Sequence, residues 1–329
     1  MKQYYNCNIF DENFELSSKF SITQKQLTLI SDLKLKPSIV QYHCEWQQGD
    51  VDNKKPFVAI PIRNCSKLLK YTLNNFKNSG MFDLSNVIII DDRSTEDLKK
   101  IIKSYPVSYL RVDNMYGFNF SMFNNIAALL SSKLGGDTFV LWNSDLWIDK
   151  IEYFSQLIQH HRDNQSTISG SKLLYPIDSL HKDDHSENIK KHFPSKLDGS
   201  YKGKVQFGGS RWVSTPISTT SGNLHCFMPH HFMRFSDKLD HRVNCNYGTS
   251  FVTGALQIID LNWFISVGGL NPSLPKNFQD VDLCLKAIEN QKKVMYFGKD
   301  IHFYHDESYT FYSNKDEQKM DKQMMADTA

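Results

Sequence analysis

The stretch NVIIIDDRSTED at residues 86–97 decides the fold of this protein. Its first half is a continuous apolar run rich in β-branched residues, which predicts a β-strand buried on both faces. Its second half is polar and acidic, a pattern typical of a loop that leads into a helix. Strands buried on both faces belong to parallel sheets, whose ligands bind beyond the carboxyl ends of the strands. This stretch therefore predicts both a sheet and the location of a site.

Buried strands and amphipathic helices alternate on both sides of this stretch. The predicted strands are 57–62, 86–92, 109–112 and 138–142, and the predicted helices are 68–76, 97–103 and 121–130. Strands that alternate with helices indicate right-handed crossovers in a parallel sheet. We therefore predict an α/β fold with a Rossmann-like, mostly parallel central sheet flanked by helices.

The second half of the chain has a weaker pattern. A helix is predicted to begin at residue 151, and the remainder of 151–250 is rich in His, Ser and Gly, which predicts an irregular region. Regular periodicity returns afterwards. It predicts a strand within 252–259, helices at 261–269 and around 281–291, and a strand at 293–297.

These patterns predict one main domain with two flanking segments. Residues 1–55 form an N-terminal extension that we expect to be partly helical, and residues 311–329 form a polar C-terminal tail. The main domain spans 56–310. Its first half, 56–150, carries the alternating strands and helices, and its second half, 151–310, includes the irregular region.

Composition excludes several classes of function. Of the 329 residues, 40% are hydrophobic and 22% are charged, which excludes a disordered scaffold. The net charge of +2 is too small to attract nucleic acid, so we expect no nucleic-acid partner. No apolar run reaches the roughly 18 residues of a membrane span, and the N-terminus is polar. We therefore expect a cytoplasmic protein with at most peripheral association at the inner face of a membrane.

Polar side chains follow three of the predicted strands. The segments at these three strand ends are Pro61-Ile62-Arg63-Asn64, Asp91-Asp92-Arg93-Ser94-Thr95 and Asn143-Ser144-Asp145. Helix capping for the second group and a simple turn for the third remain alternatives. The first strand lacks the glycines that a phosphate-cradling loop requires. A diphosphate would then need a divalent metal ion held by a carboxylate such as Asp145.

Two more candidates lie near the end of the main domain. In FQDVDLCL at residues 278–285, Asp280 and Asp282 stand two apart at a helix start, where one can face a pocket while the other caps the helix. Two ordinary helix-start acids are the alternative. Downstream, His305 is the best candidate metal ligand, although a single histidine is more often a structural residue.

Taken in order, these motifs resemble a family 2 glycosyltransferase of the GT-A fold, over about residues 56–310. The segments that carry the resemblance are AIPIRN at 59–64, VIIIDDRSTED at 87–97, GFNFSMFNNIA at 117–127, FVLWNSDLWI at 139–148, VTGALQIIDLNWFISVGGLNPSLPKNFQDVDLCLKAI at 252–288 and HDES at 305–308. The third segment is similar to a branch of bacterial polysaccharide transferases. The resemblance implies that 56–150 binds a nucleotide sugar and that 151–310 binds the acceptor and carries catalysis.

The resemblance and the residue chemistry together assign roles to single residues. Asp280 is expected to be the catalytic base, and Asp145 with His305 is expected to hold Mn²⁺ or Mg²⁺. The expected nucleotide-sugar-binding residues are Pro61, Arg63, Asn64, Asp92, Arg93, Asn119, Asn143 and Ser144. The expected acceptor-binding residues are Gly254, Gln279, Asp282 and Trp212, the last because indole rings stack on sugar faces.

The implied reaction is transfer of a hexose or deoxyhexose, with inversion, from a nucleoside diphosphate sugar to a hydroxyl of a growing glycan. A UDP- or dTDP-sugar donor is favoured, and the acceptor is a glycan or lipid-linked glycan of lipopolysaccharide or capsule synthesis. Asn143 and Gln279 stand where the family has acids, and Lys286 stands where it has Arg. These departures leave two alternatives open: a non-catalytic nucleotide-sugar or glycan-binding module, and a magnesium-dependent nucleotidyltransferase.

Overall fold

A computed structural model describes most of the main domain and parts of the N-terminal segment. The described residues are 5–6, 19–23, 41–113, 118–177, 201–219 and 222–306. The predicted tail at 311–329 lies outside these ranges. Within them, no helix combines the length and the apolar character that crossing a membrane requires.

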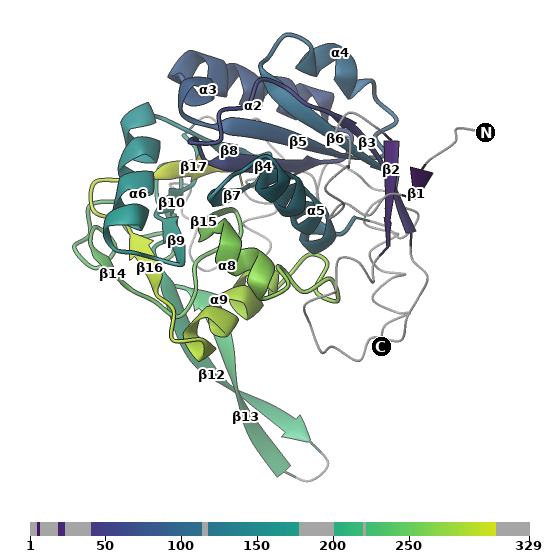
Figure 1. The fold of residues 1–329 in the computed structure, drawn as a ribbon. Helices are drawn as coiled ribbons and strands as arrows, with labels where there is room; N and C mark the ends of the chain where they lie inside the picture. The colour runs from purple at the N-terminus through teal and green to yellow at the C-terminus, as the bar shows by residue number, and fades with distance from the viewer. Residues whose placement is uncertain are drawn as a thin grey trace.

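A large twisted sheet forms the centre of the molecule (Figure 1). In spatial order its strands are β1 (Tyr5–Asn6), β2 (Lys19–Thr23), β3 (Gln41–Gln47), β6 (Val107–Asp113), β5 (Asn86–Asp92), β4 (Phe57–Ile62), β7 (Thr138–Trp142), β15 (Leu256–Asp260), β9 (Ile168–Ser171), β16 (Val294–Phe297) and β14 (Asn246–Gly248). The four central strands β6, β5, β4 and β7 are parallel. In this sheet β3, β15 and β14 run against the common direction. The predicted mainly parallel sheet is confirmed.

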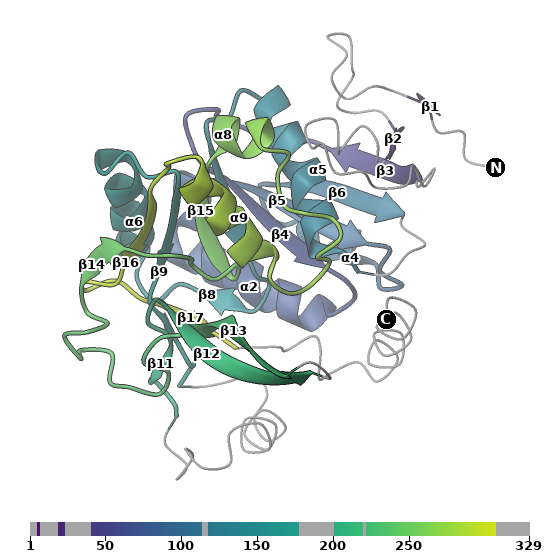
Figure 2. The ribbon, with the colours of Figure 1, turned by 90° about the horizontal axis from the view of Figure 1, so that it is seen from below.

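Helices cover both faces of this sheet (Figures 1 and 2). They are α2 (Ser66–Ser79), α3 (Met81–Leu84), α4 (Leu98–Ile102), α5 (Phe120–Lys133), α6 (Ile151–Asp163), α8 (Leu261–Ser266) and α9 (Gln279–Glu289). The side chains of β7 show which helices cover which face of the sheet, because successive side chains of a strand point to opposite faces. Trp142 packs against Phe76 of α2 and Phe154 of α6, whereas Phe139 packs against Phe264 of α8.

The strands predicted at 57–62, 86–92 and 138–142 have the predicted bounds. The strand expected within 252–259 begins only at Leu256, because the preceding residues form the loop around Gly254. The helix predicted at 261–269 ends at Ser266, because Gly268 and Gly269 adopt left-handed conformations that end helices.

The prediction of an irregular region within 151–250 was wrong for its described part. Four short strands form a second sheet in the order β11 (Val205–Phe207), β10 (Leu173–Leu174), β17 (Phe303–His305) and β8 (Leu146–Trp147). Beyond it, β12 (Ser210–Thr219) and β13 (Gly222–His231) form a long antiparallel ribbon that extends away from the body (Figure 1). Strands of two or three residues are too short to show a period, and the ribbon is rich in Ser, Thr and His.

The structure also departs from the predicted boundary near residue 55. β3 pairs antiparallel with β6, so residues 41–47 belong to the central sheet. Cys44 and Trp46 on this strand are part of the hydrophobic core. Within residues 1–55, the secondary structure that the structure describes consists of the strands β1, β2 and β3. The helical portion that we expected lies outside the described residues.

Lys172 is a buried lysine that links the two sheets. Its Nζ donates hydrogen bonds to Lys238 O at 2.7 Å, Asn244 Oδ1 at 2.8 Å and Gly298 O at 2.9 Å. Its carbonyl accepts the N–H of Phe303 at 3.0 Å, beside the strand that carries His305. Burial lowers the pKa of Lys172 from 10.5 to about 8.

This pKa predicts a specific pH dependence of stability. Between pH 8 and 10.5, Lys172 is mostly protonated in the unfolded chain and mostly deprotonated in the native protein. The free energy of unfolding therefore increases as the pH rises. Relative to a Lys172→Met variant, we expect wild-type stability to rise through this window by up to about 3 kcal/mol. Urea denaturation of both proteins at pH 7.5 and 10 measures the difference. A difference that stays constant with pH contradicts the prediction.

Candidate active site

The candidate site lies at the carboxyl ends of β4, β5 and β7, as predicted for a parallel sheet. β15 begins at this same edge, because it runs antiparallel to β7 and pairs Leu256 with Trp142. The N–H of Asn143 donates to the carbonyl of Ala255 at 3.0 Å. The N–H of the adjacent Gly254 donates to Oδ2 of Asp280 at 2.7 Å. Two groups of predicted residues, far apart in the sequence, therefore meet.

Asp280 is a half-buried carboxylate in the first turn of α9. Its two oxygens accept hydrogen bonds from the backbone N–H of Gly254 and, at 2.9 Å, from the N–H of Val281. Burial raises the pKa of the Asp280 carboxyl above its ordinary value, and these N–H groups oppose the rise. A carboxylate with a raised pKa is a stronger base, which suits the predicted role.

Gly254 leaves the space that Asp280 occupies. A Cβ atom at residue 254 would lie 3.2 Å from the Asp280 Cβ, closer than ordinary contact. We expect Gly254→Ala to displace the carboxylate by a few tenths of an ångström and to lower kcat about tenfold, because proton transfer depends on position. Steady-state kinetics with a fixed donor measures it. The control is Gly248→Ala, whose new Cβ would meet its nearest neighbours at 3.9 Å. Equal kcat values for the two variants contradict the prediction.

Helix α5 holds the loop that leads to Asp280. Asn119 caps the helix, with Oδ1 accepting the Met122 N–H at 2.9 Å, and its Nδ2 donates to Pro272 O at 3.0 Å. Asn125 contacts both backbone groups of Leu270. In the structure the Asn119 amide caps the helix and attaches the loop, and its expected contact with a nucleotide sugar remains a prediction.

Asp145 and His305 form a buried pair. Asp145 Oδ1 lies 3.2 Å from His305 Nε2, and Nε2 also lies 3.2 Å from Asn143 Nδ2. Pairing of β8 with β17 sets Leu146 opposite His305 and thereby brings the two side chains together. Carboxylate oxygen and imidazole nitrogen are donors that Mn²⁺ accepts, and the carboxylate also suits Mg²⁺. The chemistry of this pair fits a metal ion that completes its shell with substrate oxygens and water.

The rest of this loop is held by backbone contacts. Ser144 is buried, and its carbonyl accepts a hydrogen bond from Thr72 Oγ1 of α2 at 2.6 Å. Among the described residues, no group of three or more His, Cys, Asp or Glu side chains surrounds a common point. The Asp145–His305 pair remains our prediction for the metal site.

The two carboxylates at the end of β5 have different surroundings. Asp91 accepts hydrogen bonds from the Tyr109 hydroxyl, from Arg111 Nη1 at 2.9 Å and from the Ser94 N–H at 2.8 Å. Burial, together with the bond to Asp91, raises the pKa of Tyr109. Asp91 is thus a structural residue that ties β5 to β6.

Asp92 is equally buried and lies between two arginines. Arg63 Nη1 and Arg93 Nε each approach its carboxylate to 3.6 Å. Arg93 adopts a left-handed conformation with φ of 46°, which an arginine rarely takes. The ion pairs orient both guanidinium groups beside the strand ends, where positive charge can face a diphosphate.

The remaining residues of the first strand end are structural. Asn64 Oδ1 accepts the N–H of Thr95 at 2.9 Å, and the Asn64 N–H donates to Ser94 Oγ at 2.7 Å. These bonds join the loop after β4 to the loop after β5. Pro61 is buried within β4, opposite Ile90. These contacts shape the strand end, and the expected contact of Pro61 and Asn64 with a nucleotide sugar remains a prediction.

Two expected acceptor residues lie on α9. The Asp282 carboxylate pairs with Lys286 Nζ at 2.8 Å, one turn further along the helix. The pair stabilises the helix start, and the expected contact of Asp282 with the acceptor remains a prediction. Gln279 is buried at the first position of α9, and its Oε1 makes no hydrogen bond with described residues. Gln279 therefore remains a candidate for contact with a substrate.

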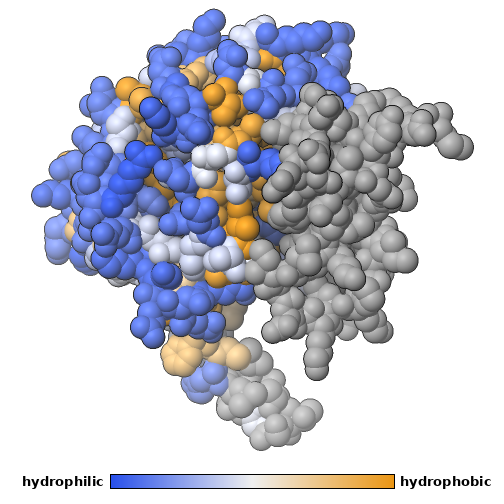
Figure 3. Space-filling view, viewed as in Figure 1, coloured by the Kyte–Doolittle hydropathy of each residue, from blue (hydrophilic) through white to orange (hydrophobic). Residues whose placement is uncertain are grey.

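Trp212 lies on the ribbon, where its indole is 36% exposed and packs edge-on against Phe251 at 5.7 Å. Phe251 precedes Gly254 by three residues, so the base of the ribbon borders the site. Phe227 and Met228 are also exposed on the ribbon. Figure 3 shows pale orange atoms on its described part, below a mainly hydrophilic body.

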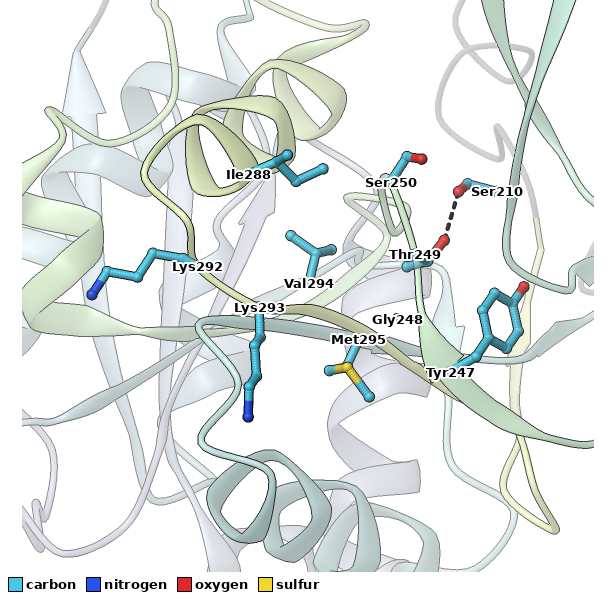
Figure 4. A pocket seen from close by; sticks show the side chains of 10 residues that line it. All are labelled: Ser210, Tyr247, Gly248, Thr249, Ser250, Ile288, Lys292, Lys293, Val294 and Met295. Carbon is cyan, nitrogen blue, oxygen red and sulfur yellow. Dashed lines mark hydrogen bonds between the residues drawn. The ribbon is translucent and has the colours of Figure 1, made fainter.

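A separate pocket of about 430 Å³ opens at the far end of α9 (Figure 4). Ile288, Val294 and Met295 line it together with Thr249 and Ser250, among others. In Figure 4 the side chains of its two lysines point away from the others. Eight helical residues, roughly 12 Å, separate Ile288 from Asp280, so this pocket is distinct from the candidate site.

Sequence reasoning missed Gln206 and Thr72, which contact His305 and Ser144. Gln206 Oε1 lies 2.9 Å from His305 Nδ1. Gln206 belongs to a three-residue strand within the region that we expected to be irregular, so no periodic pattern marked it. Thr72 is a buried polar residue among the apolar positions of α2, which was the one available signal.

The fold resembles solved glycosyltransferase structures. A structure of GalNAc-T7 with UDP, GalNAc and Mn²⁺ aligns with a TM-score of 0.51 at 14% identity, covering 76% of this chain and 43% of that one. A mannosyltransferase from Pyrobaculum calidifontis with GDP-Man and Mn²⁺ aligns with a TM-score of 0.46 at 12% identity, covering 79% and 60%. TarS residues 1–349 from S. aureus align with a TM-score of 0.44 at 15% identity, covering 79% and 62%. This chain thus spans less than two thirds of each.

No curated protein matches the chain in sequence. The model of glycosyl transferase family 2, in contrast, matches residues 57–242, which is more than half of the chain. The match covers the strands β4, β5 and β7 and the Asn143–Asp145 loop. Together with the shared architecture, it confirms the resemblance drawn from the motifs: the chain belongs to glycosyl transferase family 2 and has the GT-A fold.

Proposed function

We propose that this protein transfers a sugar from a nucleoside diphosphate sugar to an acceptor hydroxyl, with inversion at the anomeric carbon. One observation carries the proposal. The bond from Asn143 N–H to Ala255 O and the bond from Gly254 N–H to Asp280 Oδ2 join a basic carboxylate to the loop of the Asp145–His305 pair. A base joined by a short backbone path to residues that could hold a Lewis-acidic metal ion suits a direct displacement.

Asp280 removes the proton of the acceptor hydroxyl as its oxygen attacks the anomeric carbon. The raised pKa favours this transfer, and half-burial leaves the carboxylate reachable. The N–H groups of Gly254 and Val281 orient its two oxygens. The bond between the sugar and the nucleoside diphosphate breaks on the opposite side of the carbon.

Asp145 and His305 would hold a divalent metal ion beside the leaving group. When bound, Mn²⁺ or Mg²⁺ supplies positive charge that offsets the charge developing on the diphosphate. The GalNAc-T7 structure that shares this fold contains Mn²⁺ and UDP, which favours Mn²⁺ and a uridine donor here. Arg63 and Arg93 add positive charge nearby, and Asp92, which orients both, is proposed to contact the nucleotide base.

The acceptor is proposed to be a glycan hydroxyl, on a free or lipid-linked chain of a bacterial polysaccharide. Trp212 supports this choice, because its partly exposed indole packs against Phe251, three residues before Gly254, and an indole offers a flat face to a sugar ring. The buried Oε1 of Gln279 is a second acceptor contact in this proposal.

Donor binding and turnover test the proposed function. UDP-, dTDP- and GDP-sugars are incubated with the full chain and Mn²⁺, and melting temperature and product release are followed. We expect one nucleotide to raise the melting temperature, because a ligand of the folded state stabilises it. Slow hydrolysis should release that nucleoside diphosphate. Release of pyrophosphate, or binding without turnover in the presence of acceptor glycans, contradicts the proposal.

A further inference from the structure

Gln206 is a buried polar residue directly behind His305. Its side-chain Oε1 lies 2.9 Å from His305 Nδ1, and both residues are more than nine-tenths buried. The backbone carbonyl of Gln206 lies 3.2 Å from His231 Nδ1 of the ribbon. Gln206 is therefore fixed at its backbone as well as at its amide.

The small sheet brings Gln206 to this position. Its strand order β11, β10, β17, β8 carries Gln206 on the first strand, His305 on the third and the residue after Asp145 at the start of the fourth. Register between β10 and β17 and between β17 and β8 is fixed by ladder pairs. This one sheet thus holds Gln206, His305 and the strand that begins directly after Asp145.

The tautomer of His305 depends on which ring nitrogen finds an acceptor. An amide oxygen can only accept, so Gln206 Oε1 requires a proton on Nδ1, and Nε2 then presents its lone pair. Asn143 Nδ2, 3.2 Å from Nε2, can donate to that lone pair. Asp145 favours the other tautomer. Its carboxylate lies 3.2 Å from Nε2 and would accept a hydrogen bond from a proton on that nitrogen.

We propose that Gln206 is a positioning residue that keeps the proton of neutral His305 on Nδ1, so that Nε2 is available to the metal ion. This inference rests on the proposed function for the metal, and it concerns the histidine alone. Without Gln206, the Asp145 carboxylate would draw the proton to Nε2 and remove the nitrogen ligand. Partners behind metal-binding histidines commonly act in this way.

Ring-¹⁵N histidine labelling of the full chain tests the tautomer without any donor or metal. Two-bond ¹H–¹⁵N spectra at pH 8 distinguish protonated from unprotonated ring nitrogens, and a His305→Gln variant assigns the signals. We expect protonated Nδ1 in the wild type and in Gln206→Glu, which keeps an acceptor, and protonated Nε2 in Gln206→Leu. The control Gln257→Leu removes another fully buried glutamine and should leave His305 unchanged.

Titration with Mn²⁺ alone, followed by electron paramagnetic resonance, gives a second readout. We expect Gln206→Leu to weaken Mn²⁺ binding by about 10- to 100-fold, with little change in Gln206→Glu. A proton on Nε2 in the wild type, or an unchanged tautomer in Gln206→Leu, overturns the proposal. The wild type could show the expected tautomers and still fail to bind Mn²⁺ or a nucleotide. That result overturns the metal role in the proposed function and leaves the role of Gln206 in orienting His305 intact.

Discussion

Asp280→Asn is expected to lower the rate of sugar transfer by about 100- to 10,000-fold, the usual contribution of a positioned general base. The amide cannot take the acceptor proton, although its oxygen can still accept the Gly254 N–H that now binds Asp280 at 2.7 Å. Folding should be preserved, because the change removes a carboxylate whose ionised form burial disfavours. Initial rates at saturating donor and acceptor, with circular dichroism and melting temperature, measure both effects.

Two companion variants make this test specific. Glu289→Gln removes an exposed carboxylate from the other end of α9 and should leave the rate unchanged. Asp282→Asn removes the partner of Lys286 and should affect stability more than rate. If folded Asp280→Asn transfers sugar at a rate near the wild type, or if Asp282→Asn shows the larger loss, Asp280 is not the base.

Asp145→Asn is the second variant with a large expected effect. It removes the one carboxylate of the Asp145–His305 pair, so Mn²⁺ should bind more weakly and stabilise the leaving diphosphate less. We expect transfer to fall by roughly 100-fold or more, since a metal contributes several kcal/mol to such a step and each factor of ten is about 1.4 kcal/mol. Rates measured over a range of Mn²⁺ concentrations should show a higher half-saturating concentration.

Asp149→Asn is the matched control for this loss. Asp149 lies four residues further along the chain, and its side chain is 44% exposed, 3.8 Å from His302. The control should keep the wild-type rate and Mn²⁺ dependence. If Asp145→Asn keeps the wild-type Mn²⁺ dependence, residues other than Asp145 hold the metal ion.

The central sheet could be predicted because its strands are long and buried on both faces. FVAIPI at 57–62 and VIII at 87–90 are continuous apolar runs, and every residue of both strands β4 and β5 is buried. The small sheet could not be predicted, because two- and three-residue strands such as Leu146–Trp147 have no readable period. β3 was assigned to the N-terminal extension, since its polar stretch QYHCEWQ resembles a surface segment.

The candidate site was predicted unevenly. The sequence motifs identified Asp280, Asp145 and His305, and the structure brings their segments to one edge of the sheet. For Asn119 and Asp282 the motifs suggested ligand contacts. In the structure their side chains form a helix cap and a helix-surface ion pair, because short polar side chains near helix starts readily bond to nearby groups, and the ligand contacts stay predictions.

The family, the parallel core of the sheet and the acidic residues at the strand ends could all be inferred from the amino-acid sequence. These features are local: apolar runs define strands, and polar residues follow them in the chain. Only the tertiary structure decided the relations among them. It showed that β15 enters beside β7 so that Gly254 contacts Asp280, and that a sheet of four short strands places Gln206 behind His305. Such pairings depend on contacts between residues that can lie more than a hundred positions apart, as Trp142 and Leu256 or Leu146 and His305 do, and no local period exists for them.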